Sequence, residues 1–102
     1  MKIFTKEIED KLKTTPHSNM RPIFKLFCPW GAATWLITCE EDGILYGYAQ
    51  LFRDTKPEWG GLFSREEMLE ITGPFGLKIE RDLHFKDDPS VNYLNLDTLA
   101  GV

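Results

Sequence analysis

The sequence predicts an α+β fold in which an antiparallel sheet packs with two short helices. Three runs rich in β-branched and aromatic residues follow one another between residues 23 and 51, an Asp-Gly pair separates the last two runs, and helical spacing of apolar residues appears on either side. The chain has 102 residues, of which 42% are apolar, which suits one domain with one core. We expect a single domain over 1–102: an N-terminal helix and loop in 1–22, a core sheet and helix in 23–86, and a C-terminal tail in 87–102 that is flexible or docked.

Residues 4–14 are expected to form an amphipathic helix. Phe4, Ile8 and Leu12 recur every four residues, and charged residues fill most positions between them. Because a helix this short is marginal in water, it should pack on the sheet. The following segment, 14–22, contains two prolines and is expected to be a surface loop.

Residues 23–28, 32–40 and 44–51 are expected to be three consecutive antiparallel strands, a meander. Asp42-Gly43 is typical of a type I′ hairpin turn, in which both central residues need positive φ. The other connection is the segment Pro29-Trp30-Gly31.

The two turns set the register of the strands, and register decides which side chains share a face. Turns centred on 30–31 and 42–43 make Phe24, Ile37 and Tyr48 cross-strand neighbours. By the same register Leu26, Trp35 and Gln50 are neighbours. One face is expected to be core, and it carries Phe24, Leu26, Trp35, Ile37, Cys39, Tyr46 and Tyr48. The opposite face is mixed and should be partly exposed or covered by another segment.

A short strand and a second helix are expected after the meander. Residues 59–63 could be the strand. Ser64 and Glu67 form a capping box, which starts a helix that should run from Arg65 to about Thr72 and end at Gly73-Pro74. Its apolar side is expected to contain Met68, Leu69 and Ile71.

Residues 78–85 alternate and are expected to form one more strand. Ile79, Arg81, Leu83 and Phe85 would share one face, with Glu80, Asp82 and His84 on the other.

Four segments resemble a bacterial family called domain of unknown function 2958. They are Lys25-Leu26-Phe27, residues 31–35, the Ser64 to Glu70 helix, and above all residues 76–85, Gly-Leu-Lys-Ile-Glu-Arg-Asp-Leu-His-Phe. The likeness covers roughly residues 20–86. The resemblance implies a gene carried by a plasmid, conjugative element or prophage, and it implies no particular activity.

Composition argues against several classes of function. The formal charge is −4, with 12 basic residues that are scattered along the chain, so we expect no direct binding to nucleic acid. The N-terminal residues build no secretory signal and no run of about 20 apolar residues exists, so we expect a cytoplasmic protein without a membrane partner. Cys28 and Cys39 would lie about six residues out of register on adjacent strands, too far apart for a disulfide.

Glu80, Asp82 and His84 are one candidate site. On one strand face they would project the same way at intervals of about 6.5 to 7 Å, where they could hold a divalent metal or act as acid and base. The alternative is a solvated strand face, which we favour. A zinc site of Cys28, Cys39, His17 and His84 is disfavoured because the chain has no Cys-x-x-Cys spacing. We therefore expect no cofactor.

Trp30, Trp59, Phe75 and Arg81 are candidate residues for binding a partner. The three aromatic residues stand beside glycines at turn-like positions, where they either anchor a protein partner or fold back over a small core. Arg81 is placed among apolar residues, so it is either a structural ion pair, for example with Glu70, or an anchor for an anion or a partner.

The sequence leaves three hypotheses about function. The leading one is a non-enzymatic protein-binding module of a mobile element or phage, for example an inhibitor of host defence by restriction or CRISPR. The second is a small metal-dependent or acid-base enzyme built on Glu80, Asp82 and His84. The third is a self-associating structural protein, such as a homodimer. The chain contains none of the common phosphate-binding, hydrolase or zinc-protease motifs, so we expect no enzyme.

Overall fold

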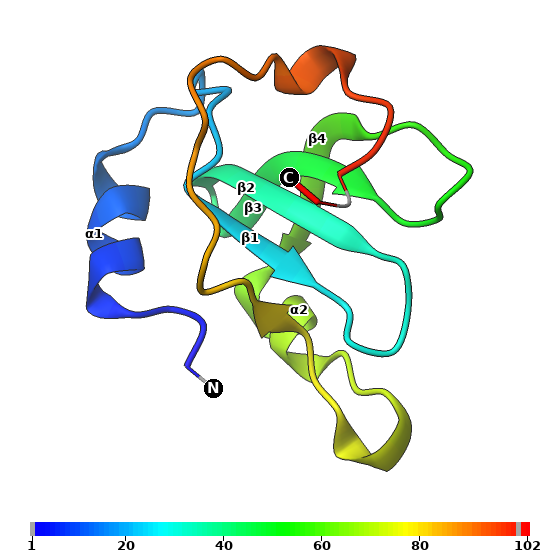
Figure 1. Cartoon of the computed structure of the whole chain (residues 1–102). Helices are drawn as coiled ribbons and strands as arrows, with labels where there is room; N and C mark the ends of the chain where they lie inside the picture. The colour runs from blue at the N-terminus through cyan, green and yellow to red at the C-terminus, as the bar shows by residue number, and fades with distance from the viewer. Residues whose placement is uncertain (1, 100) are drawn as a thin grey trace.

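A computed structural model, which describes residues 2–99 and 101–102, confirms the α+β class. Five antiparallel strands form one sheet in the order β4-β3-β2-β1-β5 (Figure 1). The strands are β1 (Phe24–Phe27), β2 (Thr34–Glu41), β3 (Ile44–Gln50), β4 (Glu58–Ser64) and β5 (Glu80–Arg81). The helices are α1 (Lys6–Thr14) and α2 (Arg65–Glu70), and two 3-10 turns are η1 (Pro74–Gly76) and η2 (Tyr93–Asn95). No helix in the described ranges has the length and apolar character needed to cross a bilayer.

Both helices begin at side-chain caps. Thr5 accepts a hydrogen bond from the amide of Ile8 at 3.3 Å, and the predicted capping box of α2 is confirmed, with Ser64 and Glu67 bonding each other's amides. α2 ends at Glu70, two residues earlier than predicted, because Ile71 takes an extended conformation and Thr72 pairs with Lys78. The placement of Leu69 on the apolar side is wrong, since its side chain is exposed.

Two ion pairs of Arg65 tie the helices to the sheet. Arg65, the first residue of α2, binds both carboxylate oxygens of Glu40 at 2.6 Å, pairs with Glu9 of α1, and lies over the ring of Phe4. These hydrogen bonds, those to Glu40 first, raise the pKa of the guanidinium. A bidentate pair of this kind fixes orientation as well as distance. Arg65 therefore sets where both helices lie on the sheet.

The predicted register holds between β1 and β2 but fails along β3. Phe24 faces Ile37 and Leu26 faces Trp35, as predicted, and the Asp42-Gly43 turn has φ of 52° and 78°. A bulge between Ile37 and Cys39 then inserts one extra residue, Thr38, into β2.

The bulge moves Tyr48 and Gln50 to the face of the sheet opposite Phe24 and Ile37. Tyr48 pairs with Leu36 instead of Ile37, and Gln50 pairs with Thr34 instead of Trp35. A shift of one residue reverses which face each later side chain occupies. The prediction that Tyr48 lies with Phe24 and Ile37 is therefore wrong, although Tyr48 is buried.

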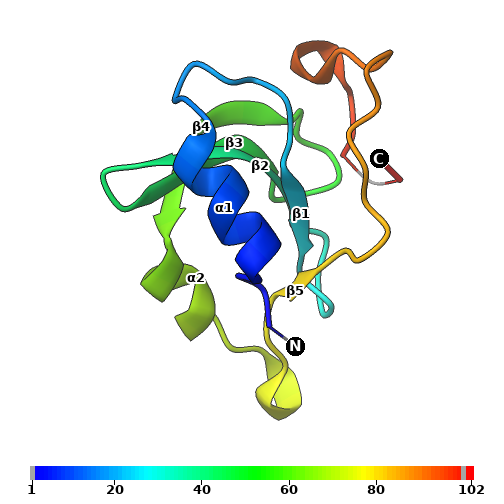
Figure 2. The ribbon, with the colours of Figure 1, turned by 90° about the vertical axis from the view of Figure 1, so that its left-hand side faces the viewer.

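The sheet buries apolar side chains on both faces. α1 and α2 cover one face, whose buried core is Ile3, Ile8, Leu12, Phe24, Leu26, Trp35, Ile37, Leu45, Met68 and Ile79. The C-terminal segment covers the other, where Leu36 and Tyr48 pack with Tyr93 and Leu99. α1 and the C-terminal segment thus lie on different sides of the sheet (Figures 1 and 2). This C-terminal segment, residues 85–99 and 101–102, is the cover expected for the mixed face.

The predicted strand over 78–85 is wrong beyond Arg81. Asp82 accepts a hydrogen bond from the amide of His84 at 2.9 Å, and the amide of Phe85 points back to the carbonyl of Asp82. An aspartate that bonds the backbone two residues on favours a turn over a strand. Ile79 and Phe85, predicted to share a face, consequently belong to the cores on opposite faces of the sheet.

Because of the bulge, we expect that Gly47 cannot be replaced by a residue with a Cβ atom without loss of stability. A Cβ atom there would lie 2.0 Å from the Leu36 carbonyl oxygen and 2.9 Å from the Ile37 Cα, so Gly47→Ala must move backbone. We expect the free energy of unfolding to fall by about 3 kcal/mol or more, measured by urea denaturation. Gly60→Ala in β4 is the matched control, because its Cβ meets nothing within 4 Å, and it should change stability by no more than about 0.5 kcal/mol. Equal stability of the two variants would contradict the bulge.

Candidate functional site

The most exposed candidate residue is Phe75, at the tip of a loop that projects from the molecule below the sheet. We call residues 71–79 the Phe75 loop (Figures 1 and 2). The Phe75 side chain is fully exposed, and its backbone is left-handed, with φ 57° and ψ 26°. A bulky residue in this region costs about 1 to 2 kcal/mol. The loop therefore holds the Phe75 side chain in solvent, and the backbone at Phe75 has a conformation that is unfavourable for a bulky residue.

The base of the Phe75 loop is held by hydrogen bonds and by Trp30. The amide of Gly73 donates to the Leu77 carbonyl at 2.8 Å, Thr72 pairs with Lys78, and the Lys78 ammonium donates to the Thr72 hydroxyl at 2.5 Å. The indole of Trp30 lies against Gly73, where a Cβ atom would be 2.3 Å from the ring. Trp30 is thus half-buried and supports the loop.

Trp59 also folds back onto the sheet. Its indole nitrogen donates to the Thr38 hydroxyl at 3.1 Å, and its ring stacks on Tyr46. His17 packs against both rings, with ring centroids 4.5 Å from Tyr46 and 5.9 Å from Trp59. Of the three aromatic candidates, only Phe75 is placed on the open surface.

His17, Cys39 and Glu41 meet beside this aromatic group. The His17 Nδ1 atom is 2.8 Å from a Glu41 carboxylate oxygen and 3.7 Å from the Cys39 sulfur. Both neighbours share one ring nitrogen, whereas a nucleophilic triad needs the acid and the nucleophile on opposite nitrogens. Burial raises the pKa of the Cys39 thiol, so the sulfur stays protonated. The contacts fix the 15–22 loop on the sheet.

The structure does not bring the other proposed zinc ligands to this point. Cys28 lines a cavity next to Lys25, and His84 lines another next to Tyr93. Both cysteines are free. Within residues 2–99 and 101–102, no three His, Cys, Asp or Glu side chains are grouped so that they could hold a metal ion.

The turn at Asp82 also separates the residues proposed as a metal or acid-base site. Glu80 lies in β5 opposite Phe27, and His84 is exposed beyond the turn. One Asp82 oxygen accepts from the His84 amide, and the other is 3.6 Å from the Lys25 ammonium. The three side chains therefore do not share one strand face, and the geometry expected for that site is wrong.

Arg81 lies at the edge of the sheet that α1 covers. It is half-buried in β5, opposite Leu26, and lines a cavity of about 180 Å³ together with Glu7 and Lys11. This position beside α1 favours a structural role over exposure to a partner.

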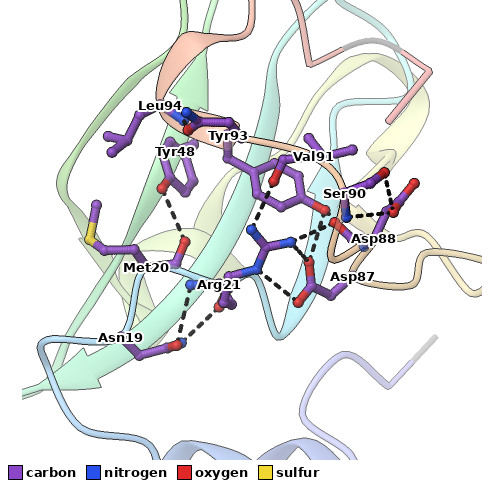
Figure 3. Close-up of polar contacts among 11 residues, drawn as sticks. Asn19, Met20, Arg21, Tyr48, Asp87, Asp88, Ser90, Val91, Tyr93 and Leu94 are labelled. Atoms are coloured by element: carbon purple, nitrogen blue, oxygen red, sulfur yellow. Dashed lines mark hydrogen bonds and ion pairs between the residues drawn. The ribbon is translucent and has the colours of Figure 1, made fainter.

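Sequence reasoning missed an arginine that joins the C-terminal segment to the rest of the chain. Arg21 donates from Nε and Nη2 to the two oxygens of Asp87, at 3.1 and 2.5 Å, and to the carbonyls of Asp88 and Val91 (Figure 3). Its guanidinium lies 4.7 Å from the centre of the Tyr93 ring. The hydrogen bond to Asp87 raises the pKa of Arg21. One side chain thus contacts four residues of the segment that covers the sheet.

Tyrosine hydroxyls complete this network. Tyr93 donates to Asp87 at 3.0 Å, and Tyr48 donates to the Met20 carbonyl at 3.0 Å (Figure 3). Burial raises the pKa of both phenols, so they remain donors. Ser90 holds the pKa of Asp88 below its usual value by two hydrogen bonds, and this stabilisation is present at neutral pH and lost as pH falls through the folded-state pKa. The only signal of this network in the sequence was the pair of acidic residues Asp87 and Asp88.

One family model matches nearly the whole chain. The family model described as Protein of unknown function (DUF2958) matches residues 3–101, which includes the C-terminal segment. No curated protein and no solved structure matches the chain.

The Arg21 network predicts that Arg21→Lys loosens the C-terminal segment while leaving the helices in place. Lysine keeps the charge but cannot bind both Asp87 oxygens and two carbonyls as a planar fork. Hydrogen–deuterium exchange of the 87–99 amides should become faster, with no change in 65–70. Arg53→Lys, on the exposed 51–57 connection, is the control. Unchanged exchange in 87–99 would show that Arg21 does not hold the segment.

Proposed function

The chain belongs to the family of proteins of unknown function DUF2958, and from its exposed surface we propose that it is a non-enzymatic protein-binding module. The observation that carries the proposal is the pre-organised Phe75 loop. An exposed aromatic side chain on a braced loop can bury much apolar area with little loss of conformational entropy. Aromatic residues of this kind are common among the side chains that dominate binding energy.

The surroundings of Phe75 define the chemistry of the partner. Leu69 and Leu77 are exposed on the same α2 and loop region and extend the apolar surface. Glu66 and Glu70 are exposed on α2, and Glu66 lies about one helical turn from Leu69 on the helix surface. An apolar centre with an acidic rim is complementary to a protein pocket bordered by basic side chains. The same acidic rim disfavours an anionic membrane surface.

The proposal predicts that a photo-reactive phenylalanine analogue at position 75 captures a protein. Benzoyl-phenylalanine at 75 should crosslink a discrete partner from host lysate, because the tip enters the partner's pocket. Leu94, an exposed apolar residue on the C-terminal segment, is the matched position for a control crosslinker. Excess wild-type chain should compete, and Phe75→Asn should not, since asparagine tolerates the left-handed backbone but removes the apolar group.

The identity of the captured protein separates the hypotheses. A component of a restriction or CRISPR system would support the narrower proposal of an inhibitor of host defence, encoded by a mobile element or phage. A second copy of this chain would instead favour self-association. Equal capture from positions 75 and 94, or full competition by Phe75→Asn, would contradict the role of the loop.

A further inference from the structure

A separate cavity opens at the end of the sheet where β1, β2, the 28–33 turn and the C-terminal segment meet. Its volume is about 640 Å³, within the range of about 300 to 1,000 Å³ usual for small-molecule sites. The polar side chains that line it include Lys25, Thr34, Gln50, Arg53 and Asp82. It shares no lining residue with the Phe75 loop.

Lys25 places a buried cation at the wall of this cavity. Its side chain is 10% exposed, and its ammonium donates to the backbone oxygen of Val102 at 2.9 Å. The Asp82 carboxylate is 3.6 Å away, longer than the 2.7 to 2.9 Å of a charge-assisted hydrogen bond. A buried charge is costly unless it is well paired. An anion in the cavity would add a second close partner.

Two other side chains that line the cavity also have free hydrogen-bond donors. The Thr34 hydroxyl and the Arg53 guanidinium have no hydrogen-bond or ion-pair partner within the described part of the chain. Gln50 is already engaged: its carbonyl oxygen accepts from the Leu99 amide and the Thr98 hydroxyl, and its amide group donates to the Thr55 carbonyl. With Lys25 and Arg53 against Asp82, the formal charge of the wall is +1 in a protein of charge −4.

The rest of the cavity wall leaves room for the apolar part of a ligand. Gly31, Ala32 and Ala33 have little or no side chain, and Phe27 and Cys28 add an apolar surface. We propose that this cavity binds a small organic anion, with a carboxylate or phosphate group at Lys25, Thr34 and Arg53 and an apolar part against the 27–33 wall. Benzoate and phenyl phosphate are the two arms of the test, since they share a phenyl group, and benzamide is the neutral control.

Titrations followed by two-dimensional amide NMR should show saturable binding of at least one anion, with shifts centred on residues 25, 34 and 53. Thr34→Val should raise the dissociation constant about tenfold, because it removes a hydrogen bond to a charged group, and Thr34→Ser should restore binding. Arg53→Gln should weaken binding roughly threefold, as expected for an exposed charge. Lys56→Gln, on the same connection but paired with Asp97, should have no effect.

Cys28 gives a second readout in the wild-type chain. Its thiol is half-buried at the cavity wall, whereas Cys39 is fully buried, so iodoacetamide should modify Cys28 first. The bound anion should slow this modification in proportion to occupancy. Equal binding of benzamide, no saturable binding of either anion, or an unchanged dissociation constant in both Thr34→Val and Arg53→Gln would overturn the proposal.

Discussion

The extra residue at Thr38 in β2 is the constraint on which the rest of the structure depends. It turns Tyr48 to the same face as Leu36, and Gly47 allows the close backbone approach that the bulge requires. Both faces of a small sheet are then apolar, and neither can be left in water. The helices, fixed by Arg65, cover one face, and the polar C-terminal segment must cover the other. Arg21 holds that segment in place through Asp87 and two backbone carbonyls.

This arrangement leaves two proposed binding features. Two ionisable side chains that were candidates for a site help to close the fold instead: His17 fixes a loop, and Asp82 ends a strand. What remains available is an aromatic tip, Phe75, on a braced loop, and a cavity wall that carries the Lys25 and Arg53 cations. The first suits a protein partner and the second a small anion. Both are binding features, which is consistent with a module that recognises other molecules.

Local patterns allowed much of the fold to be predicted, and tertiary effects account for the errors. The capping box at Ser64 and the Asp42-Gly43 turn are short-range signals and were confirmed. The bulge has no such signal, because it results from packing around Thr38. Alternation over 78–85 predicted a strand, but the local hydrogen bond of Asp82 prevailed. Isolated apolar residues such as Tyr93 and Leu99 do not recur at the spacing of a helix or a strand, so their burial could not be predicted from the sequence pattern. Exposure of Phe75 and partial burial of Trp59 likewise depend on neighbours distant in sequence.

The C-terminal segment is the layer that covers the second face of the sheet. Deleting residues 87–102 would remove Tyr93 and Leu99, two fully packed side chains worth about 1.5 to 3 kcal/mol each, and would expose Leu36 and Tyr48. This loss is a large share of the roughly 5 to 15 kcal/mol that stabilises a domain. Thermal unfolding of the 1–86 chain, followed by circular dichroism, is the most direct measurement. The account predicts a broad, uncooperative transition. A sharp transition at the melting temperature of the full chain would contradict it.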